Sequence, residues 1–233
     1  MPIAWLRAVA PFAAYRPMQA GSLRATLPVM TYTAAWGLVL NLAGIETRQG
    51  RDRAVTGIDP GAPRLSLAIG LAGADPIVGS LFQQGHGYPV GGSGKELQAL
   101  TKGCKYWIAP VRRELLSGLD VQIGIDAEGQ LLERVRRGLH GQGDWPRYGL
   151  PFAGDNNLLF DRLEMLPKPH PTRWYLPIPP RSKPLRGATR LTTGIDRWDS
   201  SRTEVAHVAP METAVDVPPK AAWVTVPSLA SAA

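Results

Sequence analysis

The 233-residue sequence predicts an α+β domain with the ferredoxin-like βαββαβ order, the layout of RNA-recognition-type domains. Two kinds of apolar spacing predict it. Alternation of apolar and polar residues is typical of half-buried strands, and recurrence every three to four residues is typical of helices. A hydrophobic content of 44% is sufficient for a packed core. We expect this domain over residues 1–167 and a small C-terminal β extension over residues 168–233.

The first two strands are predicted from alternation. The first covers residues 3–15 and places Ile3, Trp5 and Val9 on one face. The second lies within residues 62–74, where leucine and isoleucine alternate with arginine, serine and alanine. We expect this second strand to be half-buried.

The opening helix is predicted within residues 30–46, which are apolar on nearly every side although the chain has a net charge of +7. Thr31 or Thr33 can cap its N-terminus, and Gly44 stands where a left-handed C-terminal cap belongs. Gly37 is expected to permit close approach of a neighbouring surface. That surface would be the sheet together with either the C-terminal extension or a partner subunit.

The second half begins with a segment too long for an ordinary connection. Residues 75–107 are rich in glycine and glutamine and predict a projecting loop or hairpin. Two extended runs are expected within residues 105–126, a helix over residues 128–141, and a strand at the end of residues 147–166. The tail contains short strand-like runs between prolines, and we expect its last residues to fray.

Positive charge is concentrated in two parts of the sequence. Residues 1–57 contain six basic and two acidic side chains, and residues 95–113 contain five and one. A GC-rich genome would also favour arginine over lysine, so the prediction rests on these positions rather than on composition. Two basic clusters on an otherwise balanced chain indicate a binding track for a polyanion such as a nucleic acid.

Several kinds of chemistry are not supported by the sequence. The four histidines are scattered and the single Cys104 has no partner, so no metal centre and no internal disulfide are expected, and a cytoplasmic location is expected. The run "GGSGKE" lacks the spacing of a phosphate-binding loop. The opening helix is shorter than the roughly 20 continuous apolar residues of a membrane span. We therefore expect no cofactor and no membrane segment.

A longer pattern begins at "APFAAYRPMQAGSLRATLPVMTYTAAWGLVLNLAGIE", residues 10–46. An aromatic-Arg step at Tyr15 and Arg16 leads through a proline and hydroxyl segment into a helix with the pattern G-L-L-x-x-x-x-G, which begins here at Gly37. The later segments "YWIAPVRRELLSGLDVQIGID" and "RYGLPFAGDNNLLFD" continue the pattern. Over residues 2–166 the chain resembles Cas5, a subunit of type I CRISPR interference (Cascade) complexes, and is most similar to its type I-B or DevS-like branches.

The resemblance implies a fold and a function. It implies an RNA-recognition-type domain of the RAMP class, with a thumb hairpin inserted at about residues 75–107. It also implies that the protein binds and caps the 5′ handle of the guide RNA (crRNA). Its expected protein partners are a Cas7-type backbone subunit and a Cas8-type large subunit, and target DNA is reached indirectly. No catalytic residue, metal or cofactor is implied.

The resemblance, together with residue chemistry, suggests a set of RNA-binding residues. Cationic and amide side chains are candidates for phosphate or base-edge contacts, and aromatic side chains for stacking. Arg112 and Arg113 alternate across a strand, so only one of them is expected to face RNA. Arg134, Arg136 and Arg137 are expected on a solvated helix face. The predicted RNA-binding residues are Tyr15, Arg16, Arg24, Thr26, Arg48, Arg51, Gln83, Gln84, His86, Lys102, Lys105, Tyr106, Trp107 and Arg112.

Two other functions stay open at this point. The first is a metal-independent endoribonuclease that processes repeat RNA, for which His86, Tyr88, Lys95 and Lys102 are the available side chains. Polar residues of a glycine-rich loop explain the same pattern, so this is the alternative to a non-enzymatic scaffold. The second is a ligand-binding or structural β protein unrelated to nucleic acid, which only the C-terminal extension supports.

Overall fold

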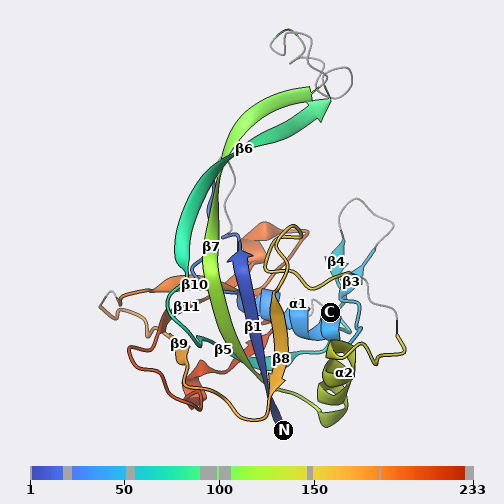
Figure 1. Cartoon of the computed structure of the whole chain (residues 1–233), viewed down its shortest axis with the longest axis vertical. Coiled ribbons are helices and arrows are strands. Elements are labelled where there is room, and N and C mark those ends of the chain that lie inside the picture. Colours follow the sequence, from blue (N-terminus) through green and yellow to red (C-terminus); the bar gives the residue numbers. More distant parts are fainter. Residues whose placement is uncertain are drawn as a thin grey trace.

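The structure, a computed structural model, describes residues 2–17, 23–50, 56–89, 99, 106–145, 149–183 and 185–228, with the backbone alone for residues 84–89, 106–110 and 200. Its central strands pair antiparallel in the order β5-β7-β1-β8 (Figure 1). This is the order of a ferredoxin-like sheet, so the predicted fold class is confirmed. In chain order the central elements are β1 (Ile3–Ala13), α1 (Tyr32–Leu42), β5 (Leu65–Leu71), β7 (Tyr106–Asp126), α2 (Gly129–Leu139) and β8 (Arg162–Leu166).

Shorter elements complete the described chain. Before the hairpin lie β2 (Leu23–Arg24), β3 (Arg48–Gln49) and β4 (Gly57–Ile58). The tail contains β9 (Arg173–Pro177), β10 (Thr189–Gly194), η2 (Ser200–Arg202), β11 (Glu204–Pro210), η3 (Lys220–Ala222) and β12 (Val224–Val226). Strands β9, β10 and β12 coincide with the strand-like runs of the sequence, whereas β11 was not predicted.

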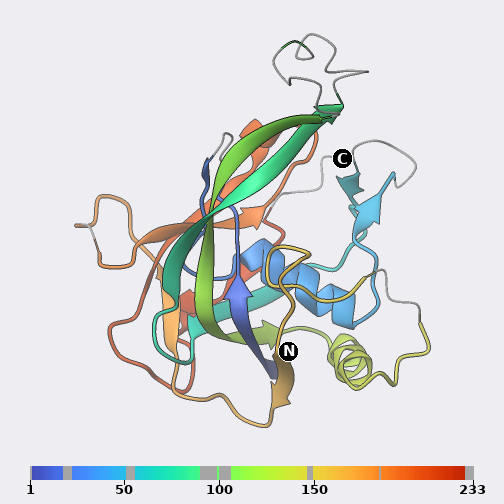
Figure 2. The same ribbon diagram turned by 45° about the horizontal axis from the view of Figure 1, so that its top comes forward.

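A long hairpin projects from the sheet (Figures 1 and 2). It consists of β6 (Ile77–Pro89) and the first half of β7, which pair antiparallel. The two extended runs expected within residues 105–126 form one strand of 21 residues. Gly118 has a φ of 74° and lies between the buried Leu116 and Leu119, so the strand changes the face it buries at this glycine.

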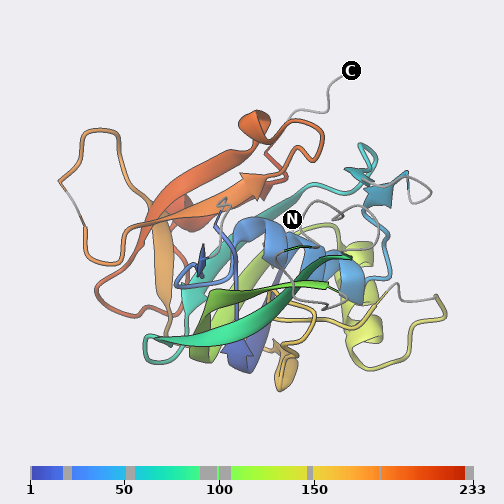
Figure 3. The same ribbon diagram turned by 90° about the horizontal axis from the view of Figure 1, so that it is seen from above.

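The C-terminal strands extend the same sheet and enclose α1 (Figure 3). Strand β9 pairs with β5 and is followed outward by β11 and β10, while β12 pairs with another part of β5. Leu191, Val208 and Val226 of these strands belong to the apolar cluster that contains α1. The sequence left open whether the C-terminal extension or a partner subunit packs on this apolar helix. In the structure the C-terminal extension does so.

The ends of α1 follow local rules, but its close contact differs from the prediction. The Thr31 hydroxyl accepts the Ala34 N–H at 3.1 Å, and Gly44 has a φ of 67°. A Cβ on Gly37 would meet no described atom within 4 Å, so the predicted close approach at Gly37 is wrong. The close approach is on α2, where a Cβ on Gly138 would lie 1.7 Å from the carbonyl oxygen of Leu42.

The first strand buries the face opposite to the one suggested by its large side chains. The core face carries Ala4, Leu6, Ala8 and Ala10, all 3% exposed or less, because small residues allow the helices to pack closely. Ile3 is 48% exposed, and Trp5 packs on Trp174 and Trp223 at ring distances of 6.0 and 6.1 Å. Strand β5 also carries apolar packing on both faces and is not half-buried.

Candidate nucleic-acid interface

The base of the hairpin is a three-stranded segment in which β7 has β6 on one side and β2 on the other. Arg112 lies in register between Phe82 of β6 and Leu23 of β2. Side chains in register project to one face of a sheet. All three are exposed, Phe82 by 79% and Leu23 by 38%. We call Leu23, Arg112 and Phe82 the exposed row.

Sequence reasoning missed Phe82 and Leu23 as candidate site residues. Phe82 ends the run "IVGSLF" and is followed by Gln83 and Gln84 in the glycine-rich segment. The available signal was an aromatic residue within a segment that was predicted to project from the fold, where binding residues are common.

Arg113 points to the other face and is 8% exposed, so the predicted alternation with Arg112 holds. Its guanidinium pairs with Asp155 at 2.5 Å, and it donates to the Gln83 side-chain oxygen at 3.5 Å. Burial alone would raise the pKa of Asp155, but the Asn157 backbone N–H and the charge of Arg113 outweigh burial and lower it. The pair fixes the loop before β8 against the hairpin base.

Two predicted contacts serve the fold instead. The Tyr15 ring is 3% exposed, and its burial raises the pKa of the hydroxyl. The Tyr15 N–H donates to the Thr26 hydroxyl at 3.0 Å, and the Thr26 N–H donates to the Glu114 carboxylate at 3.1 Å. Thr26 also donates to the Leu27 carbonyl at 3.0 Å. Tyr15 and Thr26 therefore anchor the segment before α1 to β7, and we remove them from the proposed RNA contacts.

Arg16 and Arg24 lie on the same segment with exposed side chains. Arg24 is in β2 and lies in register with Arg113, so its side chain projects to the face opposite the exposed row. Neither Arg16 nor Arg24 forms an ion pair with another described residue, and the same holds for Arg112. The hairpin base thus presents three cations whose charge no described carboxylate balances.

The remaining predicted residues are placed less favourably or fall outside the described side chains. Arg48 donates to both carboxylate oxygens of Glu46 at 2.9 Å, so its charge is already paired. Gln83 is exposed beside Phe82. Arg51, Lys102 and Lys105, with Lys95 of the endoribonuclease alternative, lie outside the described residues. The structure gives only the backbone of Gln84, His86, Tyr88, Tyr106 and Trp107.

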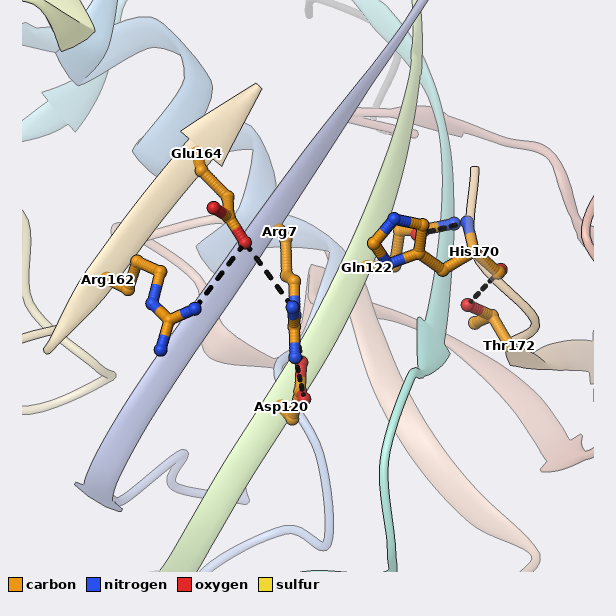
Figure 4. A network of polar contacts seen from close by, with 7 residues as sticks. All are labelled: Arg7, Asp120, Gln122, Arg162, Glu164, His170 and Thr172. Carbon is orange, nitrogen blue, oxygen red and sulfur yellow. Dashed lines mark hydrogen bonds and ion pairs between the residues drawn. The ribbon is translucent and has the colours of Figure 1, made fainter. Parts of the chain in front are cut away.

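The sheet face opposite the helices is occupied by internal contacts (Figure 4). Arg7 donates to both oxygens of Asp120 at 2.9 and 2.7 Å and lies 3.4 Å from Glu164. The hydrogen bonds to Asp120 are the main cause of a raised Arg7 pKa. Gln122 is fully buried and accepts the His170 N–H at 2.9 Å. RNA-recognition domains stack bases on this face. In this protein, the ion pairs of Arg7 and the packed rings of Trp5, Trp174 and Trp223 occupy this face.

The arginines of α2 also make contacts within the chain. Arg134 donates to the Ala43 carbonyl at 3.0 Å and stacks on Trp145 at 4.7 Å. Arg137 approaches the same ring at 5.3 Å, and Arg136 pairs with Glu133 at 3.4 Å. Arg134 thus ties α2 to the residue after α1, whereas the side chains of Arg136 and Arg137 remain 52% and 43% exposed, as expected for a solvated helix face.

The described residues show no metal-binding cluster. No group of three or more His, Cys, Asp or Glu side chains among them could hold a metal ion. No helix in the described chain is long and apolar enough to cross a membrane. What the exposed row offers chemically is the Arg112 guanidinium next to the exposed Phe82 ring.

Comparison with known proteins gives a likeness of fold. No protein-family model matches the chain, and no curated protein matches it. A chain of a solved structure described as a "CRISPR RNA-guided surveillance complex" aligns with a TM-score of 0.56 and 15% identity, over 92% of this chain and 91% of that one. A "Crystal structure of Cas protein" aligns with a TM-score of 0.52 and 13% identity, over 92% and 96%. At these identities the likeness shows a Cas-type fold.

Proposed function

We propose that this chain is a Cas5-like subunit of a type I CRISPR surveillance complex, in which it binds and caps the 5′ handle of the crRNA. The exposed row carries the proposal, because it combines a free guanidinium with an aromatic ring 79% exposed to solvent. The Cas-type fold and the sequence resemblance over residues 2–166 supply the biological setting.

The chemistry of the exposed row suits single-stranded RNA. A base stacked on the Phe82 ring contributes about 1 to 3 kcal/mol, with little dependence on sequence. The Arg112 guanidinium can take a phosphate oxygen of the same nucleotide, because guanidinium forks match phosphate geometry. Arg16 and Arg24 add phosphate contacts along the segment before α1, with Arg24 on the opposite face of the hairpin base from Arg112.

The proposal is tested by binding a synthetic crRNA handle to the purified chain at several salt concentrations. For the double variant Arg16→Gln/Arg24→Gln we expect weaker binding and a smaller salt dependence, by about 0.7 in log-log slope for each lost phosphate contact. The matched control is Arg136→Gln/Arg162→Gln, which removes two exposed arginines that face carboxylates at 3.4 and 4.0 Å. Equal affinity and slope in both double variants would disprove the assigned RNA track.

We further propose that the subunit is not an enzyme and that it joins a Cas7-type backbone subunit to a Cas8-type large subunit in the cytoplasm, with target DNA contacted indirectly. Incubating CRISPR repeat RNA with the protein in EDTA tests the first part. We expect uncut RNA, whereas a defined product that disappears in a His86→Ala variant would establish the endoribonuclease alternative. Co-purification with the two named subunit types tests the second part.

A further inference from the structure

A third basic segment lies outside the two that the sequence analysis singled out. Between Glu164 and Asp196 the sequence contains no acidic residue and six lysines or arginines. Lys168 lies before β9, and Arg173 is the first residue of β9 and pairs with Asp75 at 2.6 Å. The other four, Arg181, Lys183, Arg186 and Arg190, belong to the connection between β9 and β10 and to the start of β10.

We call the described part of this connection, residues 178–183 and 185–188, the basic loop. It projects from the flank of the sheet that carries β9, β10 and β11, at the left of Figures 1 and 3. Arg181, Lys183 and Arg186 are exposed, and none forms an ion pair with another described residue. Three unpaired cations within six residues repel one another unless an anion lies between them.

Two backbone turns lie within the basic loop. The Ser182 N–H donates to the Pro179 carbonyl at 3.2 Å, and the Ala188 N–H donates to the Leu185 carbonyl at 3.2 Å. Arg181 has a φ of 64°, an uncommon left-handed conformation for a residue other than glycine.

The neighbouring strands leave the charge of the loop uncompensated. Arg190 pairs in register with His207 of β11, and both side chains are exposed. The acidic residue of β11, Glu204, lies opposite Gly194 at the far end of β10. The cationic surface therefore continues from the basic loop onto the first residues of β10.

We propose that the basic loop binds the phosphate backbone of a second nucleic acid, separate from the RNA at the hairpin base. Guanidinium and ammonium groups without base-reading partners favour sequence-independent phosphate contact, which suits either a DNA duplex or an RNA strand. The choice of nucleic acid over another polyanion rests on the proposed function. The binding site itself does not depend on the exposed row.

The test compares two triple variants of the full chain. One replaces Arg181, Lys183 and Arg186 by Gln, and the other replaces Arg16, Arg24 and Arg112 by Gln. Affinity is measured for a short DNA duplex of unrelated sequence, a single-stranded RNA of unrelated sequence, the crRNA handle, and phosphatidylserine vesicles. For the basic-loop variant we expect about tenfold weaker duplex binding, a log-log salt slope smaller by about 2 to 3, and unchanged handle affinity. Thermal unfolding checks that both variants fold.

The outcomes separate this inference from the proposed function. If the basic-loop variant bound the unrelated DNA duplex and the unrelated RNA as well as the wild type does, the inference would be overturned. Equal losses of affinity in both triple variants for every probe would also overturn it, because they would indicate one diffuse cationic surface. Loss of vesicle binding without loss of duplex or RNA binding would assign the loop to a membrane instead. If no variant affects handle binding but the loop still governs the unrelated probes, the proposed function fails and this inference stands.

Discussion

The two halves of β7 differ in how they use their side chains. Beyond Gly118, the half that runs to Asp126 lies between β1 and β5, and its apolar residues Leu119, Val121 and Ile123 are fully buried. Its polar residue Asp120 is paired with Arg7. The half before Gly118 forms the hairpin with β6 and carries the exposed row.

The difference separates folding from recognition within one continuous strand. In the sheet half, apolar burial provides stability and the charge of Asp120 is paired with Arg7. In the hairpin half, an apolar ring and cations remain exposed, which stabilises nothing in the free chain. The Arg113–Asp155 pair and the hydrogen bond from the Thr26 N–H to Glu114 tie the hairpin base back to the fold. The following substitutions test this separation, from the largest expected effect to the smallest.

Asp155→Ala should have the largest effect. It leaves the buried Arg113 charge without its partner, and breaking a buried pair costs about 3 kcal/mol or more in unfolding free energy. Denaturant unfolding measures this loss. The control is Asp144→Ala, whose carboxylate is 81% exposed and lies 3.5 Å from Arg137, and it should change stability by less than about 1 kcal/mol. Equal effects of the two substitutions would show that the hairpin base is not held by this pair.

Gly138→Ala should destabilise the helix layer by about 2 kcal/mol, because the new Cβ would collide with the Leu42 carbonyl oxygen. Gly37→Ala on α1 is the matched control. Its Cβ meets no described atom, so helix propensity should make it neutral or stabilising by up to about 1 kcal/mol. Thermal unfolding of both variants measures the contrast, and a destabilised Gly37→Ala would contradict the open surroundings of Gly37.

Phe82→Ala should leave the unfolding free energy nearly unchanged, because its ring is 79% exposed. It should weaken handle RNA binding by about 1.5 kcal/mol, roughly tenfold, through loss of stacking. Fluorescence anisotropy with labelled RNA measures the affinity. Phe82→Trp preserves an aromatic surface and should retain binding. A stability loss without an affinity loss would assign Phe82 to the fold and remove it from the interface.

The smallest effect concerns acid stability. The lowered Asp155 pKa means that the folded state holds the ionised carboxylate more firmly than the unfolded state does. This contribution is complete above the ordinary aspartate pKa of about 4 and is lost as the pH falls through the lower folded value. Asp155→Asn should therefore show a shallower loss of stability than the wild type below about pH 4, in unfolding titrations at a series of pH values.

Much of the fold was predictable because local patterns and tertiary packing agree. The order of strands and helices followed from apolar spacing. The N-terminal cap of α1 at Thr31 and the end of the helix at Gly44 followed from single residues. The buried face of β1 was not predictable in this way. Its core side uses alanines at positions 4, 8 and 10, and the larger Trp5 serves a second cluster whose partners come from the tail.

The site was less predictable than the fold. The resemblance and residue chemistry suggested arginines 16, 24 and 112. A sequence does not show which neighbouring cation is neutralised by a distant carboxylate, as Arg113 is by Asp155. Aromatic residues are equally ambiguous. Tyr15 is buried and Phe82 is exposed, and only tertiary packing distinguishes them.

The position of β1 in the sheet has a consequence for synthesis of the chain. Both neighbours of β1 are encoded far downstream, and Arg7 and its partner Asp120 are separated by 113 residues. At ribosomal rates of about 5 to 20 residues per second, β1 waits roughly 6 to 23 seconds for its first partner strand. Such long-range pairing slows folding, so the nascent first half exposes its apolar strand and helix, and chaperones are expected to bind it during that interval.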